Sequence, residues 1–97
     1  MHYDASILLV DDYEFIRTIL ERMLQQLGYQ NLRMAADGVD ALHLLRTRPV
    51  DLVITDYHMP EMDGIGLFQS MQQDPVLAKI PVLLISGVPT KKFATQA

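Results

Sequence analysis

The chain of 97 residues has no cysteine, and its apolar runs are short. Without cysteine, disulfides, thiolate zinc sites and cysteine nucleophiles are excluded. No apolar run approaches the roughly 20 residues that a membrane-spanning helix needs. The first six residues lack the basic start and apolar stretch of a secretion signal. We therefore expect a cytoplasmic protein.

Positive charge is also scarce. Eight Lys and Arg stand against twelve Asp and Glu, for a net charge of −4 and a pI near 5.1. This balance predicts no binding to nucleic acid or to an anionic membrane. The apolar share of 49% is typical of a folded protein, and the length predicts one domain spanning residues 1–97. The arginines form no block and are interpreted as solvated: Arg17, Arg22, Arg33, Arg46 and Arg48.

Short apolar runs predict buried strands at residues 7–10, 52–55 and 82–85, with a weaker strand near 32–35. Helical spacing lies between the runs, and Gly28 fits a left-handed stop after the first helix. A further helix is expected to begin within residues 90–97. The expected inner faces of the three helices are Ile16, Ile19, Leu20, Met23, Leu24 and Leu27; Ala41, Leu42 and Leu45; and Leu67, Phe68 and Met71.

Strands that alternate with helices predict an α/β fold with a parallel sheet and right-handed crossovers. Ligands of such sheets bind at the carboxyl ends of the strands. Asp11 and Asp12 follow the first strand, Asp56 ends the third, and Ser86 ends the fourth. Converging carboxylates repel one another, and Mg²⁺ relieves that repulsion. One aspartate has a second possible role, as a nucleophile that carries a phosphoryl group, with the Ser86 hydroxyl donating to its oxygens.

Structural roles remain open for each of these residues taken alone. Asp11 or Asp12 fits a helix N-cap, Asp56 fits a turn, and Ser86 fits an ordinary strand end. Their joint occurrence at three strand ends favours the functional interpretation.

Four stretches together resemble the receiver domain of two-component response regulators, most closely the single-domain chemotaxis type. They are residues 8–12, 36–42, 51–64 and 80–86. The resemblance implies a flavodoxin-like, doubly wound parallel sheet with strand order 2-1-3-4. It also implies a phosphoprotein that takes a phosphoryl group from a sensor histidine kinase or a phosphotransfer protein. Such a protein is not a conventional enzyme, since it catalyses only its own phosphorylation and dephosphorylation, and it then changes its binding to a downstream protein.

The resemblance assigns roles residue by residue. Asp56 matches the phosphoacceptor, and Ser86 matches the switch hydroxyl. Asp12 matches a direct Mg²⁺ ligand, Asp11 a ligand acting largely through water, and Asp56 and the backbone carbonyl of His58 complete the protein's ligands. Gly64 is expected to supply a positive φ.

The sequence ends at residue 97, within the expected fourth helix of a receiver. A full receiver continues with a fifth strand, which has a lysine at its end, and a fifth helix. Lys91 and Lys92 are interpreted as surface residues rather than replacements for that lysine. Without a fifth strand, residues 82–85 would form an exposed edge, which predicts self-association through that strand or by element exchange. The alternative to self-association is that the chain is a fragment of a longer protein. An alternative is a degenerate receiver that acts as a phosphorylation-independent interaction or dimerisation module.

Two enzyme or cofactor interpretations are disfavoured. Phosphohydrolases with an aspartyl nucleophile usually carry a second aspartate two residues later, where this chain has His58. A flavin site is disfavoured because no glycine- and hydroxyl-rich phosphate loop follows the first strand.

Overall fold

Four strands alternate with three α-helices and one 3-10 turn in the part of the chain that the structure describes. The structure is a computed structural model and describes residues 3–59 and 61–85. The elements are β1 (Ile7–Val10), α1 (Glu14–Gln26), β2 (Leu32–Ala35), α2 (Gly38–Thr47), β3 (Leu52–Asp56), α3 (Gly64–Gln72), η1 (Leu77–Lys79) and β4 (Val82–Ile85). The predicted strands are confirmed, including the weak one, whereas η1 was not predicted. The helix expected within residues 90–97 lies outside the described residues.

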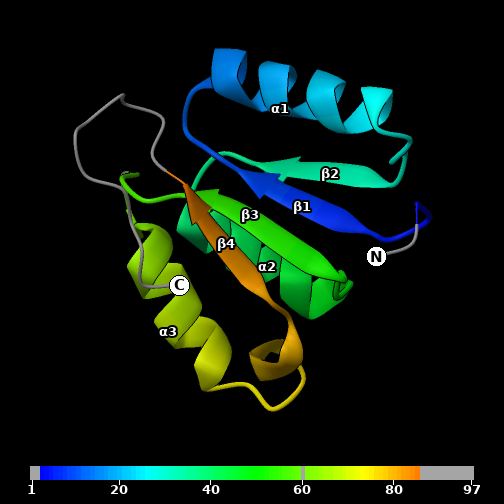
Figure 1. Ribbon diagram of the computed structural model, residues 1–97. Coiled ribbons are helices and arrows are strands. Elements are labelled where there is room, and N and C mark those ends of the chain that lie inside the picture. Colours follow the sequence, from blue (N-terminus) through cyan, green and yellow to red (C-terminus); the bar gives the residue numbers. More distant parts are fainter. Residues whose placement is uncertain (1–2, 60, 86–97) are drawn as a thin grey trace.

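All neighbouring strands pair in parallel, in the order β2-β1-β3-β4 (Figure 1). The predicted order is therefore confirmed. The chain winds from β1 outward to β2 and then crosses back to β3 on the other side of β1. This reversal makes the carboxyl ends of β1 and β3 the place where a doubly wound sheet opens a crevice.

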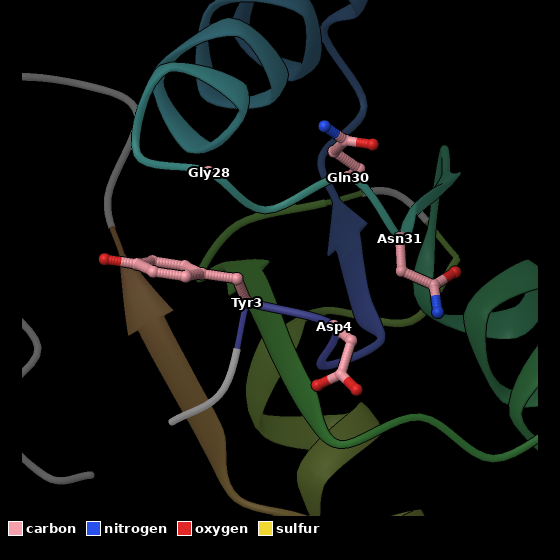
Figure 2. A pocket seen from close by; sticks show the side chains of 5 residues that line it. All are labelled: Tyr3, Asp4, Gly28, Gln30 and Asn31. Carbon is pink, nitrogen blue, oxygen red and sulfur yellow. The ribbon is translucent and has the colours of Figure 1, made fainter.

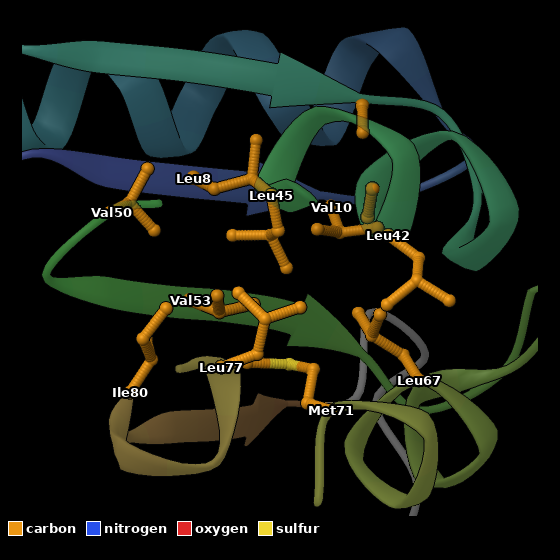
Figure 3. Close-up of a cluster of buried hydrophobic side chains, with 12 residues drawn as sticks. Leu8, Val10, Leu42, Leu45, Val50, Val53, Leu67, Met71, Leu77 and Ile80 are labelled. Atoms are coloured by element: carbon orange, nitrogen blue, oxygen red, sulfur yellow. The ribbon is translucent and has the colours of Figure 1, made fainter. Parts of the chain in front are cut away.

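One face of the sheet is thickly covered by α2 and α3 (Figure 1). Twelve buried residues form its core, to which β1, β3, both helices and η1 contribute (Figure 3). Ala41, Leu42 and Leu45 of α2 are buried as predicted. Leu67 and Met71 of α3 are buried as well, whereas Phe68 is only partly buried. Of the apolar residues that the structure describes as buried, most lie on this face.

The opposite face carries only α1 among the described helices (Figure 1). In the described part of the chain, its core has three buried residues, Ile7, Leu9 and Ile54, against which Leu20 and Leu24 pack. No residue of α1 is fully buried. The predicted stripe is therefore wrong in part, because Ile19, Met23 and Leu27 are exposed. Periodicity places apolar residues on one side of a helix, but the neighbours decide how much of that side is covered.

Two glycines act for different physical reasons. Gly28 has a φ of 108°, so the predicted left-handed stop after α1 is confirmed. Gly64 was expected to need a positive φ, and that prediction is wrong, since Gly28 is the only glycine with one in the described residues. Gly64 is required by close approach instead. A Cβ there would lie 2.4 Å from the Asp56 carbonyl oxygen and 2.8 Å from Leu84 Cδ2.

Within the described residues, no helix is both long enough and apolar enough to cross a membrane.

Candidate metal centre

Three aspartates meet at the carboxyl ends of β1 and β3. Asp11 and Asp12 directly follow β1, and Asp56 is the last residue of β3. The register pairs Val10 with Thr55, so Asp11 stands one step further along, beside Asp56. Strand alternation directs Asp11 and Asp56 toward the α1 face, since Leu9 and Ile54 two residues earlier belong to the core on that side.

The three carboxylates are close enough to share one ion. Each offers an oxygen, and these oxygens all lie within 4.8 Å of one another. Asp11 is fully buried, Asp56 is 4% exposed, and Asp12 is partly exposed. The predicted convergence of the strand-end carboxylates therefore holds for these three residues.

Hydrogen bonds orient two of the carboxylates, those of Asp11 and Asp56. Asp11 Oδ1 accepts from the Tyr13 amide at 2.9 Å, and Asp56 Oδ1 accepts from the Tyr57 amide at 2.8 Å. Asp11 Oδ2 and Asp12 Oδ1 are buried atoms without a hydrogen-bond partner in the described part of the chain. Buried polar atoms are normally satisfied, so an ion or ordered water is expected beside these two oxygens.

The electrostatics agree with this geometry. Burial raises the pKa of Asp11, and the neighbouring charges of Asp56 and Asp12 raise it further. The Tyr13 amide and the Arg17 charge pull the pKa of Asp11 the other way without cancelling the rise. The ionised cluster is therefore costly without a cation. Oxygen ligands from several carboxylates suit a hard divalent ion such as Mg²⁺.

The simple capping role for the Asp11-Asp12 pair is not what the structure shows. The N-cap of α1 is Tyr13, and no side chain caps the helix. Asp11 does accept a hydrogen bond, but from the amide of the N-cap residue itself. Asp37 and Asp63, in contrast, cap α2 and α3 by accepting from the amides of Asp40 and Gly66.

Main-chain hydrogen bonds fix the position of Tyr57, the first residue of the loop after β3. The Tyr57 amide also donates to the Ile85 carbonyl at 2.8 Å, and the Tyr57 carbonyl accepts from the Gly64 amide at 3.0 Å. The His58 side chain is exposed, and its ring centroid lies 5.0 Å from that of Tyr57. The role of the His58 carbonyl stays a prediction. Ser86, Lys91 and Lys92 lie outside the described residues.

Sequence reasoning missed two residues beside the cluster. Arg17 was interpreted as solvated, but it is partly buried and its Nη1 donates to the Asp11 carbonyl at 2.6 Å. The position of Arg17 in the sequence could have indicated this contact. A cation near a helix N-terminus interacts unfavourably with the helix dipole, so a specific contact is expected to hold it there. Thr55 is fully buried, and its hydroxyl donates to the Asp56 carbonyl at 3.1 Å. Because Thr55 lies within an apolar run, nothing in the sequence marked it as a neighbour of the cluster.

A separate hollow of about 440 Å³ lies at the other end of the strands (Figure 2). Tyr3, Asp4, Gly28, Gln30 and Asn31 line it. The rings of Tyr3 and Tyr29 meet edge to face, with centroids 5.3 Å apart. The hollow is remote from the aspartate cluster, since its lining residues precede β1 and β2.

The fold and the acidic crevice define a class of protein. The family model for the response regulator receiver domain matches residues 7–97. The chain therefore belongs to the response regulator receiver family, and it has the flavodoxin-like fold that the resemblance implied.

Several chemotaxis and response regulator proteins are similar to this chain. Chemotaxis protein CheY-3 of Vibrio cholerae serotype O1 is 38% identical over 97 residues, which is all of this chain and 75% of that protein. The crystal structure of the N-terminal domain of a response regulator receiver protein from Methanoculleus marisnigri JR1 has a TM-score of 0.80 and 35% identity, covering 89% of this chain and 69% of that one. Chemotaxis response regulator CheY4 of Vibrio cholerae has a TM-score of 0.81 and 30% identity, covering 90% and 72%.

Proposed function

We propose that this protein is a phosphoaccepting receiver of a two-component phosphorelay, with Asp56 as the phosphoacceptor. One observation carries the proposal: the Asp56 carboxylate lies within 4.8 Å of two further carboxylates, and two of their buried oxygens have no hydrogen-bond partner in the described residues. Such a cluster has the charge to hold a divalent cation beside a nucleophilic carboxylate.

The covalent step is a phosphoryl transfer. A carboxylate oxygen of Asp56 attacks the phosphorus of a phosphohistidine, the new O–P bond forms, and the P–N bond breaks. Its electron pair returns to the imidazole nitrogen, so Asp56 becomes an acyl phosphate. The bond from the Tyr57 amide restricts rotation of the Asp56 carboxylate, which supports attack from a defined direction.

Asp11, Asp12, Asp56 and the His58 carbonyl are the proposed ligands of Mg²⁺. When bound, the ion supplies positive charge against the phosphoryl oxygens. The proposed role of Ser86 is to donate its hydroxyl to one of those oxygens. Later hydrolysis of the acyl phosphate would return the protein to its starting state.

The proposed donor is a phosphohistidine of a sensor histidine kinase or a phosphotransfer protein in the cytoplasm. Residues 1–97 would act as one receiver unit. Phosphorylation would shift the population between two conformations that differ in affinity for a downstream protein.

Intact-mass analysis after incubation with acetyl phosphate and Mg²⁺ tests the proposal. The wild-type protein should gain the mass of one phosphoryl group, and Asp56→Asn should gain none. Asp40→Asn is a matched control, because Asp40 is an exposed residue of α2, and it should gain the group as the wild type does. A wild-type protein that stays unmodified, or an Asp56→Asn variant that is modified, would contradict the proposal.

A second candidate function is phosphorylation-independent self-association. β4 forms the edge of the described sheet, and Leu83 is 48% exposed there. An apolar edge strand is a template for pairing with another chain. Sedimentation velocity at micromolar concentration tests this. A dimer that persists in Asp56→Asn and dissociates in Leu83→Lys favours it, and a wild-type monomer excludes it.

A further inference from the structure

The junction between β1 and α1 is held by a bond that the resemblance did not predict. No side chain caps α1, and its N-cap residue Tyr13 has an extended backbone. Instead, Arg17 reaches back from the second turn of α1, and its Nη1 donates to the Asp11 carbonyl at 2.6 Å. The Arg17 amide continues the helix by donating to the Tyr13 carbonyl at 3.1 Å.

This bond acts on the peptide group that joins two of the clustered aspartates. The peptide group is planar and includes the Cα atoms of both Asp11 and Asp12. Its carbonyl oxygen is held by Arg17, and the Asp11 amide is held by the Ala35 carbonyl of β2 at 3.2 Å. Holding that oxygen restricts rotation of the plane. The directions in which both carboxylates leave the backbone are therefore restricted together.

Arg17 restricts this peptide group without hydrogen-bonding to the two unpartnered carboxylate oxygens. Its bond goes to a main-chain oxygen, and Asp11 Oδ2 and Asp12 Oδ1 still have no hydrogen-bond partner in the described residues. A guanidinium that satisfied these oxygens would compete with a metal ion. Bonding to the carbonyl orients the carboxylates and leaves those two oxygens available.

We propose that Arg17 is a positioning residue for the Mg²⁺ site, acting through the Asp11 carbonyl on the carboxylates of Asp11 and Asp12. This inference rests on the proposed function, because it assumes that the cluster binds Mg²⁺. It makes Arg17 an outer-shell partner of the ligands, and loss of such partners typically weakens metal affinity 10- to 100-fold.

The positioning role and the charge of Arg17 predict opposite changes in the Kd for Mg²⁺ when Arg17 is replaced by a neutral residue. Removing a cation beside three carboxylates would tighten Mg²⁺ binding if charge alone mattered. If Arg17 positions the ligands, Arg17→Gln should raise the Kd for Mg²⁺ about tenfold. Arg17→Lys keeps the charge but replaces the rigid guanidinium fork by a flexible ammonium, so it should raise the Kd by only about threefold.

The test is a titration of Mg²⁺ into wild type, Arg17→Gln, Arg17→Lys and Arg22→Gln, by isothermal calorimetry. Arg22 is an exposed arginine of the same helix, so Arg22→Gln makes the same charge change away from the site and should leave the Kd within about twofold. A variant that is partly unfolded in a reversible equilibrium would show an apparent Kd raised by the inverse of its folded fraction. The folded fraction of each variant is therefore measured by urea unfolding, and a Kd that stays raised after division by that effect is the signature of positioning.

Each outcome decides a different claim. Wild type that binds no Mg²⁺ contradicts the proposed function itself. Wild type that binds Mg²⁺, together with Arg17→Gln that binds as tightly or more tightly, overturns only the role of Arg17. If Arg17→Gln does not fold, Arg17→Lys decides: a Kd raised about threefold supports positioning, and an unchanged or lower Kd overturns it.

Discussion

The two faces of the sheet differ in how thickly they are covered. Among the residues that the structure describes, the face under α2 and α3 has twelve buried core residues, and the face under α1 has three. Yet the aspartate cluster lies on the thinly covered face, because strand alternation directs the side chains of Asp11 and Asp56 toward α1. Within residues 3–59 and 61–85, the apolar burial therefore lies mainly on one face, and the acidic cluster lies at the rim of the other.

The strongest test of this comparison uses the same substitution on both faces. Leu67 of α3 is fully buried, and Leu24 of α1 is only partly buried. Leu67→Ala should lower the free energy of unfolding by about 3 kcal/mol, since it leaves a cavity. Leu24→Ala should cost about 1 kcal/mol. Urea unfolding of both variants measures the difference, and equal losses would contradict the asymmetry.

Gly64 links the packed face to the site. Gly64→Ala would place a Cβ 2.4 Å from the Asp56 carbonyl, so α3 must shift. We expect a loss of about 2 kcal/mol of stability, together with weaker Mg²⁺ binding. Gly66→Ala is the control, because its Cβ would meet the flexible Met62 side chain at 3.1 Å. The control should change stability by less than about 0.5 kcal/mol. Thermal unfolding with and without Mg²⁺ compares the two variants.

At the rim, the cost of the buried Asp11 charge should be visible in the protein without metal. The folded pKa of Asp11 is raised above its ordinary value of 3.8. Its contribution to stability is therefore fully present below that value and is lost as the pH rises through the folded pKa. Asp11→Asn removes the ionisation and should stabilise the metal-free protein at pH 7 by about 1 kcal/mol.

The same variant should lose the stabilisation that Mg²⁺ gives the wild type. Thermal unfolding between pH 3 and pH 7, with and without Mg²⁺, measures both effects. Asp40→Asn, an exposed control, should show neither. An Asp11→Asn variant that is less stable than wild type at pH 7 without metal would mean that the cluster is not repulsive.

The smallest effect is expected on the outer side of α1. Phe15 is 74% exposed, so Phe15→Gln should change the free energy of unfolding by less than about 0.5 kcal/mol. Urea unfolding at low protein concentration measures it. A loss above about 1 kcal/mol would show that something covers this side of α1 in solution, and the contrast between the two faces would then be smaller than the described residues indicate.

Much of the fold could be predicted because its signals are local. Short solid apolar runs located three of the four described strands, a weaker mixed pattern located β2, and alternation with helices indicated a parallel sheet. The burial of α1 could not be predicted, because Ile19 and Met23 satisfy helical spacing whether or not a neighbour covers them. The reason for Gly64 was also missed, since its close approach to the Asp56 carbonyl joins segments that only tertiary packing brings together.

The candidate site likewise combines residues that could be predicted from the sequence with contacts that could not. Asp11, Asp12 and Asp56 could be proposed from the sequence because parallel strands bring their carboxyl ends to one edge. Their separation, their two unpartnered buried oxygens and the Arg17 bond to the Asp11 carbonyl could not.

The sequence by itself determined which segments form strands, the order in which they alternate with helices, and the family to which the chain belongs. These follow from residue type and spacing along the chain. Only the tertiary structure decided which apolar residues are covered, why glycine is required at position 64, and how an arginine comes to hold the backbone between two aspartates. Those outcomes depend on distances between atoms that are far apart in sequence, and no periodicity encodes such distances.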